Sequence, residues 1–321
     1  MSEKKYLTPH DEFFHYVFSK EENARELILF SLPDEIIQLM DLEKITVSQE
    51  SFVDDALKSR HSDILIRTAI TGEESIVYIL VEHKSYPYRW TLLQLLKYMV
   101  RIWERELTRK GRGSRQLPPI VPLIFYHGIR RWRFPLDFPA YIRAGSKGIE
   151  TYIPRFRAEL IDLRRTEDRR ISGSILFLSA LKTFKYIMAG LKKHLGEILE
   201  GIAEKALDEE RRSFLEALFQ YILEGGRIDE ESLNRELERA EFKEQKEVYM
   251  TIGEKLKKKG IEEGIEKAKQ EDLIRQLDKK FSLTEEERDA IKKVKDINKL
   301  DAAIDAFVFA ETKEEVLKLL R

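Results

Sequence analysis

The segment that most restricts the fold of this chain is "SDILIRTAITGEESIVYILVEHKS" at residues 62–85. Two runs rich in Ile and Val flank a polar turn, which is the pattern of a β-hairpin. We expect the turn to centre on Gly72-Glu73, because Gly suits the first loop position of a type II′ turn. Asp63 then stands directly opposite Glu82, with Cβ atoms about 5 Å apart. A bulge or an off-centre turn would break this pairing.

The outer end of the hairpin gathers charge in an otherwise apolar strand pair. Lys84 lies two residues beyond Glu82 and shares its face of the sheet, whereas His83 points to the other face. Two facing carboxylates repel each other, and a hard cation such as Mg²⁺ relieves that repulsion. Lys84 could then position a water molecule or stabilise an anionic transition state. A solvated cluster at a strand end explains the same spacing without a metal, because such spacings also arise by chance.

The next segment, "WTLLQLLKYMVRIWERELTRK" at 90–110, predicts a helix that is apolar on most faces and therefore largely buried. Gln94 and Tyr98 are four residues apart and share one of its faces. A buried Gln needs a hydrogen-bond partner. That partner is either water or phosphate at the end of the hairpin, or a backbone group of the core.

Strand signals stop near Ile171, and helical patterns follow. Before that point we expect a helix that starts at Thr8 and Pro9 and is ended or interrupted by Pro33. Further short strands are expected near 44–49, in "IVPLIFYHG" at 120–128 and near 158–162, with Pro122 favouring an edge or a bulge. The expected organisation is an α/β domain at 1–170, a helical extension at 171–245, a charged helical connector at 246–272 and a small helical domain at 273–321.

The connector reads as a long charged helix with few core residues. Gly260 and Gly264 share one of its faces, which suits either close helix packing or a solvated helix. Helix 240–270 is also a candidate homodimer element. Thr284 followed by Glu287 predicts a capping box at the start of a helix in the last domain.

Charge is segregated along a chain whose net charge is only −1. Residues 84–170 contain 20 Lys and Arg against 8 Asp and Glu, whereas residues 1–83 contain 8 against 17. A basic face would attract a polyanion, although the same arginines could instead pair with the acidic N-terminal part. The absence of cysteine excludes disulfides and thiol chemistry. With no signal-like N-terminus and no apolar run of about 20 residues, we expect a cytoplasmic protein.

An acid on one strand, E-x-K on the next and Q-x-x-x-Y on the following helix resemble the PD-(D/E)XK nuclease superfamily, although "SDILI" lacks the Pro of the first motif. The resemblance is closer to the bacterial Rpn recombination-promoting nucleases, often labelled YhgA-like putative transposases. It runs in order from Pro9 to Trp132 through "PHDEFFHYVFSKEENARELILFSLP", "SFVDDALKSRHSDILI", "YILVEHKS", "LLQLLKYMVRIWE" and "LPPIVPLIFYHG". From about Leu273 the chain resembles a small helical domain of unknown function found on related proteins.

The resemblance implies a PD-(D/E)XK core, a mixed central sheet flanked by helices, and a Mg²⁺-dependent DNA endonuclease with Mn²⁺ as an alternative. It implies Asp63 and Glu82 as metal ligands, Lys84 as the catalytic lysine and Gln94 and Tyr98 as accessory residues. Further candidate ligands are the backbone carbonyl of His83 and the carboxylate of Asp11, which suits the helix dipole equally well. Other candidates are read as structural: Asp54 and Asp55, the core or turn residue His127, and the core residue Trp132.

The basic block then has a role in binding DNA phosphates with little sequence specificity. The candidate residues are Arg109, Arg112, Arg115, Arg130, Arg131 and Arg133. Two other functions fit the sequence as well. One is a nucleic-acid-binding or transposition-associated protein without hydrolysis, and the other is a toxin-like regulatory protein acting through its C-terminal helices.

Overall fold

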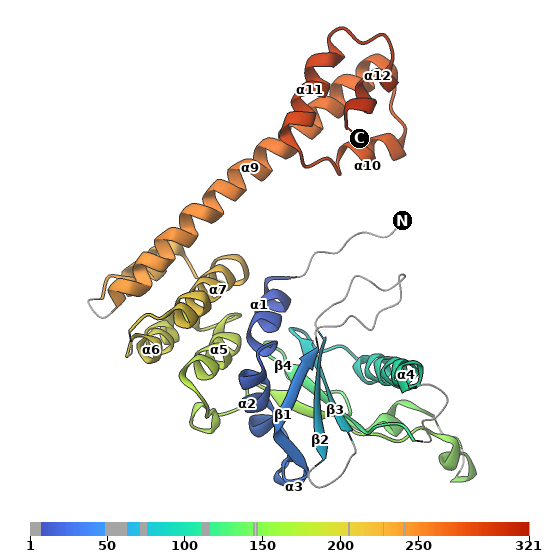
Figure 1. Cartoon of the computed structure of the whole chain (residues 1–321), viewed down its shortest axis with the longest axis vertical. Helices are drawn as coiled ribbons and strands as arrows, with labels where there is room; N and C mark the ends of the chain where they lie inside the picture. Colours follow the sequence, from blue (N-terminus) through green and yellow to red (C-terminus); the bar gives the residue numbers. More distant parts are fainter. Residues whose placement is uncertain are drawn as a thin grey trace. The chain divides into compact units, whose positions relative to one another are not determined.

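The computed structural model describes residues 8–48, 63–70, 76–110, 116–143, 145, 147–204, 206–226, 228–239 and 242–320 (Figure 1). The chain divides into two compact units, Met1–Tyr249 and Met250–Arg321. Among the described helices, none combines the length and the apolar character that crossing a bilayer requires.

The first unit is built on a five-stranded sheet in the order β1-β2-β3-β4-β5. The strands are β1 Met40–Ser48, β2 Asp63–Ile70, β3 Ile76–Lys84, β4 Ile120–Tyr126 and β5 Glu159–Asp162. β1, β2 and β3 pair antiparallel, and β4 and β5 run parallel to β3. The strands expected near 44–49, 120–128 and 158–162 are therefore confirmed as β1, β4 and β5.

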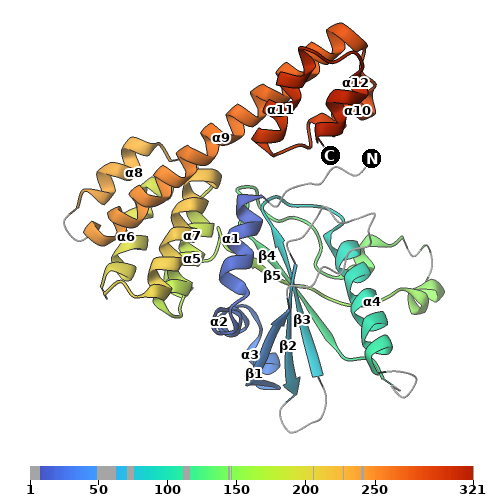
Figure 2. The same cartoon turned by 45° about the horizontal axis from the view of Figure 1, so that its top comes forward.

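Helices cover both faces of this sheet (Figures 1 and 2). One face is covered by α4 Thr91–Lys110, which packs on Leu65, Leu80 and Ile124. The other face carries the larger core, in which Ile64, Ile79 and Phe125 pack with the remaining helices of the unit. Those helices are α1 Pro9–Phe18, α2 Glu21–Ser31, α3 Asp34–Ile37, α5 Ile175–Tyr186, α6 Leu191–Ala203, α7 Glu209–Gly225 and α8 Glu230–Leu237. Alternation along each strand thus sorts its side chains between two cores.

The start of the first helix is confirmed, but its length is not. Thr8 and Asp11 form a capping box, with Pro9 in the first turn. The helix stops at Phe18, and α2 begins only at Glu21. Buried Asn23 explains the break, since its Nδ2 donates to the carbonyl oxygen of Val17 at 2.7 Å and so satisfies a group that the helix end leaves open.

Two expectations about the central elements are wrong. β4 is an interior strand, and its register with β3 runs from Ile120 to Tyr126 without a bulge. Pro122 is tolerated because pairing with β5 begins only at Leu123, so β4 has a neighbour on one side where the N–H is missing. α4 is not largely buried, because Leu93, Val100 and Leu107 are exposed along its outer face.

The second unit is a helical domain with its own apolar core around Leu277, Ile291 and Leu300. Its helices are the part of α9 Lys243–Phe281 from Met250 onward, α10 Glu285–Ile291, α11 Ile297–Phe307 and α12 Lys313–Leu317. The capping box of Thr284 and Glu287 is confirmed. α9 is one helix of 39 residues that continues through the expected connector into the C-terminal unit. A Cβ added at Gly260 or Gly264 would meet nothing within 4 Å, which favours the solvated helix over close packing within this chain.

Candidate active site

The pairing of Asp63 with Glu82 is confirmed at the level of the backbone. β2 and β3 pair without interruption from Asp63 opposite Glu82 to Ala69 opposite Ile76. The turn expected at Gly72-Glu73 lies outside the described residues, as does the side chain of Asp63. The register still places the Asp63 backbone next to Glu82, at the end of the hairpin that leads into α4.

Glu82 is a buried carboxylate on the face of β3 that α4 covers. Its side chain is 0% exposed, and its Oε1 accepts a hydrogen bond from Gln94 Nε2 at 2.9 Å and forms an ion pair with Lys84. Its Oε2 is buried without a hydrogen-bond partner among the described residues. A buried carboxylate oxygen left without a partner is costly. It is the kind of oxygen that a hard divalent cation binds.

Gln94 connects the members of the Glu82 cluster, which consists of Glu82, Lys84, Gln94 and Tyr98. Its Oε1 accepts from Lys84 Nζ at 3.3 Å, and its Nε2 lies 2.9 Å from the hydroxyl oxygen of Tyr98. The structure therefore brings Glu82, Lys84, Gln94 and Tyr98 together, and Gln94 contacts charged groups of β3. Lys84 is only 11% exposed, so the ammonium and the carboxylate face each other with little water between them.

His83 points to the opposite face of β3, as expected, and there it meets residues that the sequence did not indicate. Its Nδ1 lies 3.0 Å from Asp11 Oδ1, and its ring stacks on His127 with centroids 5.0 Å apart. His10 lies against His127, and its Nδ1 is 2.8 Å from the hydroxyl oxygen of Tyr221. No sequence spacing links positions 10, 83 and 127, so only the fold reveals this histidine cluster. The role of the His83 carbonyl as a ligand stays a prediction.

Burial sets the protonation of this histidine cluster. It lowers the pKa of His10 to about 4, with the neighbouring His83 acting in the same direction. Burial also lowers the pKa of His83, although Asp11 opposes the shift, and it lowers that of His127 well below its ordinary value. Burial alone would raise the pKa of Asp11, but the hydrogen bond and charge of His83, together with Thr8, bring it below its ordinary value. Asp11 therefore contacts His83 on the far face of β3 and takes no part in the hydrogen bonds around Glu82.

The candidate DNA-binding arginines fall into three groups. Arg109 forms two hydrogen bonds with the buried carboxylate of Glu106, at 3.1 and 2.9 Å, so it has an internal partner. Arg112 and Arg115 lie outside the described residues, as do Asp54 and Asp55. The remaining three are exposed and follow the carboxyl end of β4: Arg130, Arg131 and Arg133. Because β3 and β4 are parallel, this segment leaves the sheet at the same edge as Lys84.

Two candidates read as structural are buried. Trp132 packs against Tyr126 and Phe134, which confirms it as a core residue. His127 is 0% exposed at the end of β4, within the histidine cluster. Several arginines of the basic block also pair within that block, as in Arg165 with Asp162 and Arg157 with Glu159.

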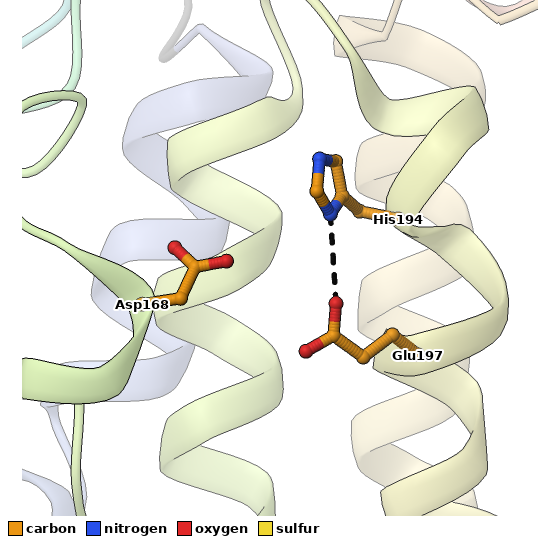
Figure 3. A group of neighbouring side chains, drawn as sticks. All are labelled: Asp168, His194 and Glu197. Atoms are coloured by element: carbon orange, nitrogen blue, oxygen red, sulfur yellow. Dashed lines mark hydrogen bonds and ion pairs between the residues drawn. The ribbon is translucent and has the colours of Figure 1, made fainter.

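A second group of possible metal ligands lies away from the sheet end. Asp168, His194 and Glu197 offer ligand atoms within 4.8 Å of one another, and Figure 3 shows the three side chains turned toward a common space. Each carboxylate already has a cationic partner, Lys185 for Asp168 and Lys182 for Glu197. Glu82 is also paired with a lysine, but its carboxylate is fully buried, whereas the side chains of Asp168 and Glu197 are 33% and 48% exposed. Water can solvate these two carboxylates, so the group needs a cation less than the buried Glu82 Oε2 does.

The fold and the Glu82 cluster define an α/β protein with a buried carboxylate, a lysine and an amide at the end of a mixed sheet. Residues 8–213 match the family described as "Putative transposase, YhgA-like". The chain belongs to this family. No solved structure matches it.

Curated relatives carry names of the recombination-promoting nucleases. The chain is 33% identical over 129 residues to recombination-promoting nuclease RpnA of Escherichia coli K12, a match covering 40% of this chain and 43% of that protein. It is 32% identical over 123 residues to RpnD of Escherichia coli O157:H7, covering 38% and 46%. The chain thus spans less than half the length of these two relatives. A longer match, 25% identical over 290 residues and covering 86% and 90%, is to a K12 protein named inactive recombination-promoting nuclease-like protein RpnE.

Proposed function

We propose that this chain is a Mg²⁺-dependent endonuclease of the PD-(D/E)XK type that hydrolyses phosphodiester bonds of DNA, with Mn²⁺ as an alternative metal. The observation that carries the proposal is the buried Glu82 Oε2, which has no hydrogen-bond partner among the described residues, while Oε1 of the same carboxylate is paired with Lys84. The register that sets Asp63 opposite Glu82 supports a second carboxylate ligand at the same point. The names of the nuclease relatives support the class of reaction.

In this proposal Asp63 and Glu82 hold the cation, with the His83 carbonyl as a further ligand. A divalent cation there would neutralise charge on the phosphate and acidify water at the site. Lys84 orients the attacking water or donates to the phosphate oxygens as negative charge develops. Gln94 positions both groups, because its amide contacts the Glu82 carboxylate and the Lys84 ammonium. Tyr98 in turn fixes the amide of Gln94.

The exposed arginines after β4 complete the proposed DNA surface. The segment after β4 leaves the sheet at the same end as Lys84. Its exposed arginines can there contact phosphates on either side of the scissile bond: Arg130, Arg131 and Arg133. Phosphate contacts carry no sequence information. We therefore propose cleavage with little sequence specificity.

The test compares nicking of supercoiled plasmid by the parent chain and by Glu82→Gln, Lys84→Ala and Glu197→Gln, with Mg²⁺ or with chelator. We expect cleavage that requires the metal and is lost in the first two variants, while Glu197→Gln retains it. A second readout is the melting temperature, which Mg²⁺ should raise in the parent and in Glu197→Gln but not in Glu82→Gln. The opposite pattern, with loss only in Glu197→Gln, would move the metal to the Asp168 group.

A second candidate function is nucleic-acid binding without hydrolysis. It is favoured by the length of the match to the relative named inactive, which covers 86% of this chain. It predicts that the parent binds DNA in a salt-dependent way but nicks no plasmid with Mg²⁺ or Mn²⁺, and that Glu82→Gln binds equally well. Metal-dependent nicking by the parent would eliminate it.

A further inference from the structure

A pocket of about 300 Å³ adjoins the Glu82 cluster on the side of α4. Seven residues line it, on α4 as far as Arg101 and just before that helix: Tyr88, Trp90, Leu93, Gln94, Lys97, Tyr98 and Arg101. Gln94 and Tyr98 belong both to this lining and to the hydrogen-bond network of Glu82. The pocket therefore shares two side chains with the proposed catalytic site.

The lining combines aromatic rings with positive charge. Trp90 is 43% exposed, and the guanidinium of Arg89 lies 5.3 Å from the centre of its ring. Tyr88 and Tyr98 add two more aromatic side chains, and Lys97 and Arg101 add two cations. An exposed tryptophan in a basic pocket is unusual for a surface that only meets water. It is the composition that binds nucleic-acid strands, in which bases stack on rings and cations meet phosphates.

The size of the pocket further limits which ligands can bind in it. A volume of about 300 Å³ is at the lower end of the range for ligand pockets. It suits one planar group and is too small for a helix or an extended peptide. Lys97 and Arg101 in the lining argue against a purely apolar ligand. A single nucleobase with its phosphate matches all of these groups. The base can stack on the aromatic rings and hydrogen-bond to the Gln94 amide, and the phosphate can pair with the cations.

We propose that this pocket binds one unpaired nucleobase next to the phosphate addressed by Glu82 and Lys84. This inference rests on the proposed nuclease function and adds a substrate class to it. In a duplex both faces of a base are stacked on neighbours, so a base can enter the pocket only from a single strand or after leaving the stack. The preferred substrate is accordingly single-stranded DNA or a duplex with locally unpaired nucleotides.

The test measures binding in the full-length Glu82→Gln background, so that no probe is cleaved. The probes are fluorescein-labelled oligo(dT) and a blunt duplex of equal length, read by anisotropy with Mg²⁺ present. Trp90→Ala should weaken oligo(dT) binding about 10-fold or more and duplex binding less than about 2-fold, and Trp90→Phe should restore most of the loss. Leu107→Ala is the matched control, because Leu107 is equally exposed on α4 but lies outside the pocket.

Tryptophan fluorescence gives an independent readout. Oligo(dT) should quench the emission of the protein with Trp90 present, and Trp90→Phe should remove that quenching while Trp103 and buried Trp132 stay in place. If Trp90→Ala weakens both probes equally, or if oligo(dT) binds without quenching, the pocket is not a base site, although the nuclease proposal stands. If the parent neither binds nor cleaves any of these probes, both proposals fail.

Discussion

Gln94 Nε2 lies 2.9 Å from Glu82 Oε1, so a helix that begins after β3 returns to the end of that strand and fixes its acid. The same amide accepts from Lys84 at 3.3 Å through its oxygen. Gln94 is therefore the residue that sets the relative position of the carboxylate and the ammonium. The contact depends on the position of α4, which forms the crossover between the parallel strands β3 and β4.

Replacing Gln94 by Leu should lower the nicking rate about 10- to 100-fold and raise the Mg²⁺ concentration needed for half-maximal rate, as loss of an outer partner does at other metal sites. The side chain keeps its volume, so the fold should survive. The measurement is a Mg²⁺ titration of plasmid nicking. Gln220→Leu, at a partly buried Gln on α7, should leave both quantities unchanged; an unchanged Gln94→Leu variant would remove Gln94 from the site.

Gly128→Ala should destabilise the end of β4 and reduce activity with it. A Cβ at this position would collide with the carbonyl oxygen of Ser85, next to Lys84, and with Tyr126. We expect a loss of about 1–3 kcal/mol in the free energy of unfolding, measured by urea denaturation. Gly148→Ala is the matched control, since nothing lies within 4 Å of a Cβ there. Equal stability of the two variants would contradict this account of Gly128.

The free energy of unfolding should fall as the pH drops from about 6.5 toward 4. Burial holds the pKa of His10 at about 4, below its ordinary 6.5, so in this window the unfolded chain binds a proton that the folded chain refuses. Above pH 6.5 both states are neutral and the residue contributes nothing.

The measurement is urea denaturation at pH 7 and pH 5. His10→Gln keeps a polar group for Tyr221 but does not titrate. It should reduce the difference between the two pH values by about 1–2 kcal/mol after allowance for solvent screening. A variant with the same pH difference as the parent would show that the folded and unfolded chains protonate His10 alike.

Removing the exposed arginines after β4 should reduce the salt dependence of DNA binding. Each lost phosphate contact lowers the slope of log affinity against log salt by about 1. With a duplex probe, the triple variant Arg130→Ala, Arg131→Ala, Arg133→Ala should thus lose about 3 from the slope, and with a single-stranded probe about 2. Arg169→Ala, at an exposed arginine that pairs with Glu167, should leave it unchanged. A slope unaltered in the triple variant would place the phosphate contacts elsewhere.

The sequence predicted the arrangement of the Glu82 cluster well, because each contact there depends on local backbone geometry. Hairpin symmetry gives the pairing of Asp63 with Glu82, and strand alternation puts Lys84 with Glu82 and His83 opposite. Helical spacing then puts Tyr98 beside Gln94. The histidine cluster was not predictable, because His10 and His127 reach His83 from two elements far apart in the sequence. The contact of Asp11 with His83 was not predictable either, because it also depends on tertiary packing.

The errors about secondary structure have physical reasons of the same kind. Pro122 excludes pairing on one side only at its own position, and the sequence could not show that β5 starts one residue later. The break between α1 and α2 depends on the side chain of Asn23 reaching a carbonyl oxygen.

The ion pair between Lys84 and Glu82 has a consequence for how the site assembles. In the folded chain the ammonium already balances the charge of the buried carboxylate, so the site can form before any metal arrives. In the proposed function, a cation would bind the second carboxylate oxygen of Glu82 together with Asp63, while Lys84 stays paired with the first oxygen. The protein should therefore fold and be stored without metal, in contrast to domains whose folding requires the ion. For the proposed nuclease, adding the metal to the stored protein should be enough to start cleavage.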